Sequence, residues 1–240
     1  MKTTFPGFSR EALAFLKDLE QNNTREWFHP RKEEFEALLR NPMLELAAAL
    51  NAALARFAPE YVTEPKKAVM RIYRDTRFSA SKTPYKDRLA ASFGRHGLDE
   101  TGGAEFYFSV NHKVVEIAGG LYHPEKEILM SVRSRLADSS DDFNKLVKNH
   151  KLQKRMGGLQ GEELSRAPKG FAPDHPAINL IKKKSWVFFA QLEPEVAISP
   201  NLLPEIASRF EVLVPVLEYF NDPLITKRAT KVKLDRLNGF

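Results

Sequence analysis

The stretch that decides the fold class is residues 104–119, which read AEFYFSVNHKVVEIAG. From Phe106 to Val110 every second residue is large and apolar, which is the period-two pattern of a half-buried strand. A short polar segment, residues 111–113, separates this run from a second apolar run at residues 114–119. Two such runs joined by a short turn predict an antiparallel hairpin.

The residues before this hairpin show the spacing of helices rather than strands. Ser9 can cap a first helix, because its hydroxyl oxygen can accept a hydrogen bond from a free backbone N–H. A second helical stretch runs from Trp27 to Leu39. Asn41 followed by Pro42 predicts the cap and first turn of a third helix. We therefore expect residues 1–60 to be mostly helical.

Three further segments are predicted as strands. Val69–Arg74 is short and rich in β-forming residues, residues 88–93 form a weaker candidate, and Trp186–Leu192 reads as a buried extended segment. Helical patterns return after the hairpin, at residues 124–137, 140–149 and 199–219. Helices on both sides of a block of strands, without regular βαβ alternation, indicate an α+β fold with a mainly antiparallel sheet.

The domain organisation follows from length and from the absence of a linker. The 240 residues contain no internal repeat and no low-complexity segment, so we expect a single domain over residues 1–222, with N-terminal and C-terminal helices flanking the sheet. Residues 223–240 form a basic tail without an apolar stripe. We expect this tail to be disordered or foreign to the natural chain.

Composition excludes several classes of protein. The chain has 42% hydrophobic residues and no cysteine, so it can bury a core but cannot form disulfides, zinc–thiolate sites or a thiol nucleophile. No apolar run approaches the length of a membrane span, and the first residues lack a signal-peptide core. We expect a cytoplasmic, globular protein that does not enter a membrane.

The sequence also lacks several standard nucleotide-binding and catalytic motifs. There is no Walker loop, no G-x-G-x-x-G and no G-x-S-x-G. The six histidines never pair at the spacings that place two imidazoles on one helix face. We therefore predict no metal and no cofactor.

Positive charge is concentrated in one segment. Between Lys66 and Arg95 nine basic residues stand against two acidic residues, Asp75 and Asp87. Clustered positive charge attracts phosphates and nucleic acids. The densest part is residues 71–86, RIYRDTRFSASKTPYK. There, regular alternation would place Arg71, Tyr73 and Asp75 on one face of a strand and Ile72 and Arg74 on the other.

We interpret this basic segment as an anion site for phosphate or carboxylate. Arginine offers a planar fork of donors, lysine offers a point charge, and hydroxyls can orient the ligand. The candidate residues are Arg71, Arg74, Asp75, Arg77, Ser79, Lys82, Tyr85, Lys86 and Lys169. The structural alternative is an ion-pair network in which Asp75 neutralises Arg71 or Arg77.

The same segment resembles a known family. Residues 71–86 are similar to the R-x-x-R-D-x-R-F-S-x-x-K-x-P-Y-K signature of the domain of unknown function 2461 family. Similarity continues in three other blocks, at residues 15–28, 119–133 and 166–184, although Tyr122 stands where the family's central block has tryptophan. The resemblance covers residues 5–222 and implies one intact module. It implies no activity, because the family is uncharacterised.

Three functions remain open at this stage. An anion pocket acting on a phosphorylated small molecule would have Asp174 and His175 as its acid/base pair, although Asp-His-Pro also makes a good helix start. A nucleic-acid-binding module would use aromatic rings between the basic residues, namely Tyr73, Phe78, Tyr85 and Phe93. A scaffold would use its arginines structurally. The sequence leaves open whether the protein is an enzyme, and it does not identify the oligomeric state.

Overall fold

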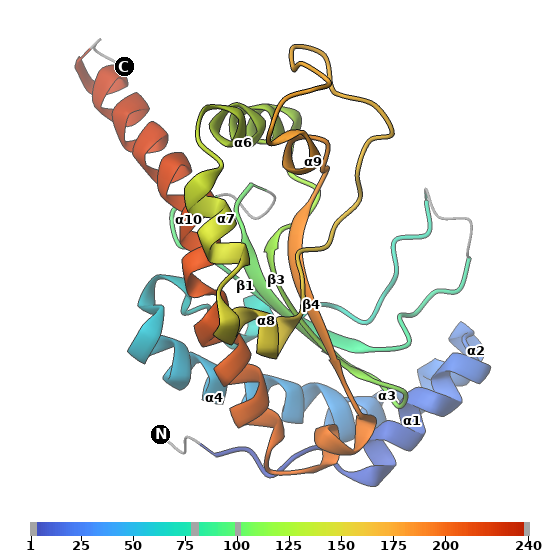
Figure 1. The fold of residues 1–240 in the computed structure, drawn as a ribbon. Coiled ribbons are helices and arrows are strands. Elements are labelled where there is room, and N and C mark those ends of the chain that lie inside the picture. Colours follow the sequence, from blue (N-terminus) through green and yellow to red (C-terminus); the bar gives the residue numbers. More distant parts are fainter. Residues whose placement is uncertain (1–3, 78–81, 99–101, 238–240) are drawn as a thin grey trace. The chain divides into compact units, whose positions relative to one another are not determined.

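The computed structural model describes residues 4–77, 82–98 and 102–237, with side chains as far as residue 225. Within these residues the strands form one antiparallel sheet in the order β1-β2-β3-β4, with helices before and after it in the chain (Figure 1). The strands are β1 (Leu89–Gly94), β2 (Glu105–Val110), β3 (Val115–Leu121) and β4 (Trp186–Leu192). The predicted α+β class is confirmed.

The chain divides into two compact units. The first contains Met1–Phe93, Tyr107–Ile117 and Gln191–Ser208, and the second contains Gly94–Phe106, Ala118–Ala190 and Arg209–Phe240. The single domain expected for residues 1–222 stays a prediction, as does the expected character of the tail after it.

Helices make up most of the first unit. They are α1 (Arg10–Gln21), α2 (Arg25–Phe28), η1 (His29–Arg31), α3 (Lys32–Phe35), η2 (Glu36–Arg40), α4 (Asn41–Phe57), η3 (Pro59–Tyr61), α5 (Pro65–Ala68) and η4 (Pro194–Ile198). The predicted cap at Ser9 is confirmed, because the Ala12 N–H donates to Ser9 Oγ at 3.1 Å.

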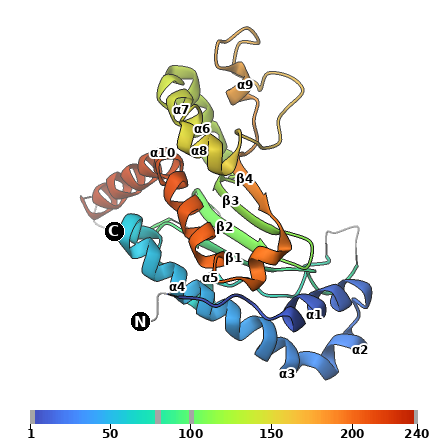
Figure 2. The same cartoon turned by 60° about the horizontal axis from the view of Figure 1, so that its bottom comes forward.

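The predicted restart of the helix at Asn41 is wrong. The helical run from Arg25 continues through this point into α4 without a break (Figure 2). Pro42 has no N–H to donate, and the π-helical turn η2 precedes it. In this turn the Asn41 N–H donates to the Glu36 carbonyl, five residues back. The wider turn therefore carries the chain past the proline, and Asn41 is not the N-cap of α4, a position that Arg40 occupies.

An aromatic cluster forms the core next to these helices. Phe28 lies at its centre, with ring centroids 5.3 Å from Phe35, 6.5 Å from Phe15 and 4.1 Å from Tyr85. All four rings are buried. Burial of rings of this size contributes much of the stability of a core, so this cluster holds the start of the chain against residues near position 85.

The turn of the predicted hairpin is confirmed. Asn111 Oδ1 accepts hydrogen bonds from the N–H groups of Lys113 and Val114 at 2.7 and 2.8 Å. An asparagine side chain that bonds its own backbone in this way is a frequent turn-former. The turn therefore joins β2 to β3 at the place expected from the sequence.

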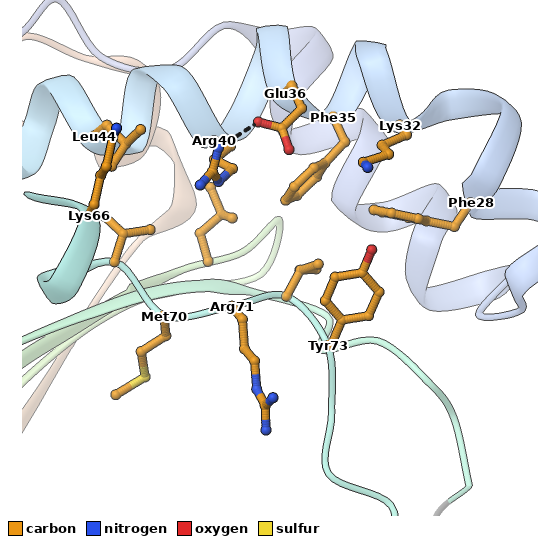
Figure 3. Close-up of a pocket in the computed structure, with 13 residues that line it drawn as sticks. Phe28, Lys32, Phe35, Glu36, Arg40, Leu44, Lys66, Met70, Arg71 and Tyr73 are labelled. Atoms are coloured by element: carbon orange, nitrogen blue, oxygen red, sulfur yellow. Dashed lines mark hydrogen bonds and ion pairs between the residues drawn. The ribbon is translucent and has the colours of Figure 1, made fainter.

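Val69–Arg74 is not one of the sheet's strands, contrary to expectation. It makes isolated antiparallel bridges, Val69 with Ala91 and Tyr73 with Tyr85. Val69 and Tyr73 are four positions apart, whereas their partners Ala91 and Tyr85 are six apart, so the two segments do not stay in register. Burial still alternates as expected: Arg71, Tyr73 and Asp75 are exposed, Ile72 is buried and Arg74 is half-buried. Figure 3 shows Tyr73 pointing toward the helices and Arg71 pointing away from them.

The second unit contains α6 (Lys126–Asp138), α7 (Asp141–Val147), α8 (His150–Met156), α9 (Ile178–Ile181) and most of α10 (Leu202–Leu237). Helix α6 lies beside α9 (Figure 1). The sequence did not predict α8, which Asn149 caps by accepting two backbone N–H groups. Helix α10 passes through Pro215 and continues beyond the end expected at Tyr219.

Close backbone approach in the second unit explains one glycine of the central block. Gly120 has a φ of +135°, and a Cβ at this position would lie 2.2 Å from the carbonyl oxygen of Trp186. No other residue type fits between β3 and β4 here without displacing backbone. The reason for this glycine is therefore strand packing.

Candidate anion-binding site

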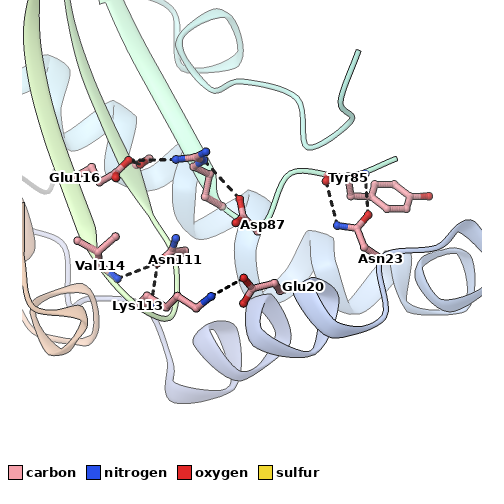
Figure 4. A network of polar contacts seen from close by, with 10 residues as sticks. Glu20, Asn23, Tyr85, Asp87, Asn111, Lys113, Val114 and Glu116 are labelled. Atoms are coloured by element: carbon pink, nitrogen blue, oxygen red, sulfur yellow. Dashed lines mark hydrogen bonds and ion pairs between the residues drawn. The ribbon is translucent and has the colours of Figure 1, made fainter. Parts of the chain in front are cut away.

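The site begins with a contact between two segments that are far apart in the sequence. The side-chain amide of Asn23 donates to the Tyr85 carbonyl at 3.1 Å and accepts from the Tyr85 N–H at 3.0 Å (Figure 4). This pair of bonds replaces the backbone partner that a neighbouring strand would supply. It fastens the end of the basic segment to the start of α2.

Tyr85 itself belongs to the core. Its side chain is 1% exposed and stacks on Phe28 with an interplanar angle of 25°. Burial raises the pKa of Tyr85 above its ordinary value. The ring therefore supports the segment, which is a different role from the orientation of a ligand expected from the sequence.

A cavity of about 600 Å³ lies where these segments meet. The helical side contributes Arg25 and His29, which the sequence analysis did not select as site residues. The basic segment contributes Arg74 and Lys82, together with Tyr73, Thr76, Pro84 and Tyr85. None of the lining residues that the structure describes is acidic, so this part of the wall is positive.

A cluster of cations adjoins Arg74. Lys86 is half-buried, and its pKa is lowered first by burial and then by the positive charges of Arg71, Arg88 and Arg74. Burial and like charges both disfavour the protonated amine. The structure therefore brings together three of the predicted site residues, Arg71, Arg74 and Lys86, and adds Arg88.

The partners of these four cations differ. Arg88 lies 3.6 Å from Asp87 Oδ1 and 3.3 Å from Glu116 Oε2, so it is neutralised (Figure 4). Within the described residues, no carboxylate forms an ion pair with Arg71, Arg74 or Lys86. We call these three residues the open cation cluster.

Arg77 and Asp75 follow the structural alternative instead. Arg77 Nε and Nη2 donate to the two carboxylate oxygens of Asp75 at 3.0 and 2.7 Å. These hydrogen bonds hold the pKa of Asp75 well below its usual range, with a smaller contribution from the charge of Arg71. The two side chains are exposed and neutralise each other's charge, so we do not count Arg77 in the open cation cluster.

The remaining candidates of the basic segment are Lys82 and Ser79. Lys82 Nζ donates to the Thr76 carbonyl at 3.0 Å, which closes the loop beside the cavity. Ser79 and the neighbouring Phe78 lie outside the described residues.

The other predicted site residues belong to the second unit. Lys169 and Asp174 are exposed there. His175 Nδ1 accepts the Ala177 N–H at 3.0 Å, and the His175 carbonyl accepts from Ile178 at the start of α9. Within the described residues, no hydrogen bond joins Asp174 to His175. Helix α9 begins at Ile178 with Ala177 at the N-cap position and no side-chain cap, so Asp174 is not the cap expected of an Asp-His-Pro helix start. A catalytic role for Asp174 and His175 stays a prediction.

A polar network next to Arg88 was missed by the sequence analysis. Glu116 Oε2 accepts a hydrogen bond from Ser109 Oγ at 3.0 Å in addition to its contact with Arg88. Tyr107 lies within the electrostatic range of the same groups, and burial raises the pKa of its hydroxyl. The polar positions of the predicted hairpin carried this signal, because Tyr107, Ser109 and Glu116 point to the face opposite Phe106 and Phe108.

The described residues contain no group of three or more His, Asp or Glu side chains placed to hold a metal ion. None of the described helices combines the length and the apolar character that crossing a membrane requires.

The comparisons with known proteins identify the family. No curated protein and no solved structure matches the chain. The family model described as "Conserved hypothetical protein (DUF2461)" matches residues 11–219, a range that includes the open cation cluster and the whole cavity. The family expected from the signature at residues 71–86 is thereby confirmed: the chain belongs to the DUF2461 family of conserved hypothetical proteins.

Proposed function

We propose that this protein binds a small molecule that carries a phosphate or carboxylate group, through Arg71, Arg74 and Lys86. One observation supports the proposal above all. Residues 72–74 and 84–86 lie side by side, since the Arg74 N–H donates to the Pro84 carbonyl and the Lys86 N–H donates to the Ile72 carbonyl, each at 2.8 Å. Lys86 is half-buried, and no described carboxylate pairs with it, with Arg71 or with Arg74. Buried charges in proteins are normally paired, and like charges destabilise one another. A bound anion offsets both costs.

The donors suit this class of ligand. Arg71 and Arg74 can each present two parallel N–H groups to a carboxylate or phosphate, while Lys86 adds a compact charge. Arg74 also lines the cavity of about 600 Å³, whose other cations are Arg25 and Lys82. This volume lies within the usual range for small-molecule sites. The remainder of the ligand therefore has room beside the anionic group.

The nucleic-acid alternative has weaker support. A single-stranded nucleic acid stacks its bases on exposed rings, yet Tyr85 and Phe93 are 1% and 0% exposed. Of the four rings considered from the sequence, Tyr73 is 46% exposed, and Phe78 lies outside the described residues. A concave cavity with one accessible ring favours a small molecule.

Thermal denaturation tests the proposal. Phosphate, pyrophosphate and citrate are added to the purified protein, with sodium chloride at the same ionic strength as the control. At ten times its Kd, a ligand selective for the native state adds about 1.4 kcal/mol of stability. For a chain of this size that raises Tm by roughly 3–6 °C.

Three variants locate the effect. Arg74→Gln and Lys86→Gln should each abolish the anion-specific rise in Tm. Arg77→Gln is the matched control, because it removes a guanidinium from the same segment but one already paired with Asp75. Arg77→Gln should keep the rise. An anion-insensitive parent protein, or equal losses in all three variants, would rule out the proposed site. A short oligonucleotide that raised Tm far more than pyrophosphate would favour the alternative.

A further inference from the structure

A second cavity in the first unit has a different character. It measures about 390 Å³ and lies between the run α2–α4 and residues 66–73 (Figure 3). Its apolar lining comes from both sides, with Phe28, Phe35 and Leu44 on the helices and Ile72 and Leu89 opposite them. A wall of this kind excludes water from a ligand's hydrocarbon part and gains affinity from doing so.

The charged residues of the same cavity are almost all positive. Lys32, Lys66, Arg40 and Arg71 line it with one acid, Glu36. That acid is already bound to Arg40, at 2.9 Å. Within the described residues, Lys32 and Lys66 have no ion pair. The cavity therefore combines an apolar wall with unneutralised positive charge.

Tyr73 adds a polar group directed toward the helices. Figure 3 shows its ring rising from the segment toward α2 and α3, with the hydroxyl on the side of Phe28 and Lys32. A phenol can donate one hydrogen bond to an anionic oxygen, and the Lys32 ammonium can donate others. An anionic group near Lys32 and Tyr73 would leave its apolar part against Phe28 and Phe35.

We propose that this cavity binds a small organic anion with an apolar body, of the class of aromatic or short-chain aliphatic carboxylates. This goes beyond the anion site at Arg71, Arg74 and Lys86, with which the cavity shares only Arg71, because it requires an apolar part in the ligand. Size is consistent with this class: an apolar cavity of roughly 150 Å³ accepts benzene. The larger volume here accommodates a substituted ring or a chain of several carbons.

Calorimetric titration with a series of carboxylates tests the inference. Acetate, butyrate, hexanoate, benzoate and phenylacetate are compared with 1-hexanol, benzyl alcohol and inorganic phosphate. Each added methylene that becomes buried should lower Kd by about fourfold, so hexanoate should bind well over tenfold more tightly than butyrate. The alcohols should bind more weakly than the carboxylates of equal length. Equal affinities along the series would overturn the inference.

Two lysines provide a matched pair of variants. Lys32→Gln removes the ammonium placed beside the anionic group and should weaken hexanoate and phenylacetate several-fold while leaving the alcohols unchanged. Lys67→Gln removes a lysine that does not line the cavity and lies 3.7 Å from Glu64. Lys67→Gln should bind as the parent does. Equal losses in both variants would show a general charge effect and overturn the site.

Filling the cavity gives a second readout. Leu44→Phe enlarges a half-buried lining residue and should block the carboxylates, with the melting curve confirming that the variant is folded. Unchanged hexanoate binding by folded Leu44→Phe would contradict the inference. Arg74→Gln separates the two proposals, because it should lose the response to phosphate and keep hexanoate. Loss of hexanoate binding in Lys32→Gln, with the response to phosphate kept, would leave the phosphate site standing.

Discussion

Arg133 in the second unit is a buried cation and Lys86 in the first is a half-buried one, and their surroundings differ. Arg133 is 5% exposed, and its Nε and Nη2 donate to the carbonyl oxygens of Ile181 and Lys183 at 2.8 and 3.0 Å. Lys86 is flanked by three arginines and has no carboxylate partner among the described residues. The donors of Arg133 thus have protein acceptors, whereas Lys86 has no carboxylate partner among the described residues.

The difference teaches which cations of a family signature to treat as ligand-binding. Arg133 and Lys86 both fall in the blocks that resemble the family, so resemblance alone does not separate them. What separates the two residues is the set of groups that accept hydrogen bonds from, or pair with, their side-chain N–H groups. A guanidinium whose N–H groups donate to buried carbonyls stabilises the fold. A cation surrounded by like charges lowers stability, and a bound anion would offset that cost.

Arg133→Met should show the largest effect. The substitution keeps the aliphatic bulk but leaves two carbonyl groups of the second unit without their donors. We expect the free energy of unfolding, measured with urea, to fall by about 2–5 kcal/mol. Lys86→Met should not destabilise the protein at neutral pH. A neutral Arg133→Met, or a strongly destabilised Lys86→Met, would break the comparison.

Asn23→Ala should have the next largest effect, because it releases both backbone bonds to Tyr85. We expect a loss of about 1–3 kcal/mol in urea unfolding, together with a weaker response of Tm to phosphate. Asn22→Ala is the matched control. Asn22 is the neighbouring residue, and its side chain donates at the surface to the Asp18 carbonyl. Equal losses in the two variants would mean that the bonds to Tyr85 do not position the basic segment.

The smallest effect is a pH dependence that sharpens the comparison. The pKa of Lys86 is lowered in the folded protein, relative to the ordinary value of 10.5 that we take for the unfolded chain. Between these two values the unfolded chain binds more protons, so the free energy of unfolding should rise as the pH rises through this window.

Lys86→Met should lack that rise. Urea unfolding of the two proteins from neutral pH toward pH 10.5 measures the difference. Bound phosphate should flatten the rise in the parent, because an anion raises the pKa of the lysine. Parallel plots of unfolding free energy against pH for parent and variant would show that the arginines do not lower the pKa of Lys86. The electrostatic basis of the open cation cluster would then be lost.

The sequence by itself determined the features that depend on neighbouring residues. The cap at Ser9, the hairpin with its turn at Asn111 and strand β4 follow from local hydrogen bonding and short-range periodicity, which do not need the rest of the chain. The α+β class follows from their order. The signature at residues 71–86 also indicated Arg71, Arg74 and Lys86 as members of a candidate site, because charge density is a property of the sequence.

Only the tertiary structure decided which cations have a carboxylate partner among the described residues. Asn23 meets Tyr85 across 62 positions, Arg25 and His29 join the cavity from α2 and η1, and Asp75 pairs with Arg77. Val69–Arg74 forms isolated bridges in place of the expected strand because its partner segment runs out of register, which no local pattern reveals. Pairing between distant residues depends on packing of the whole first unit, and a sequence pattern carries no distance between residues that are far apart in the chain.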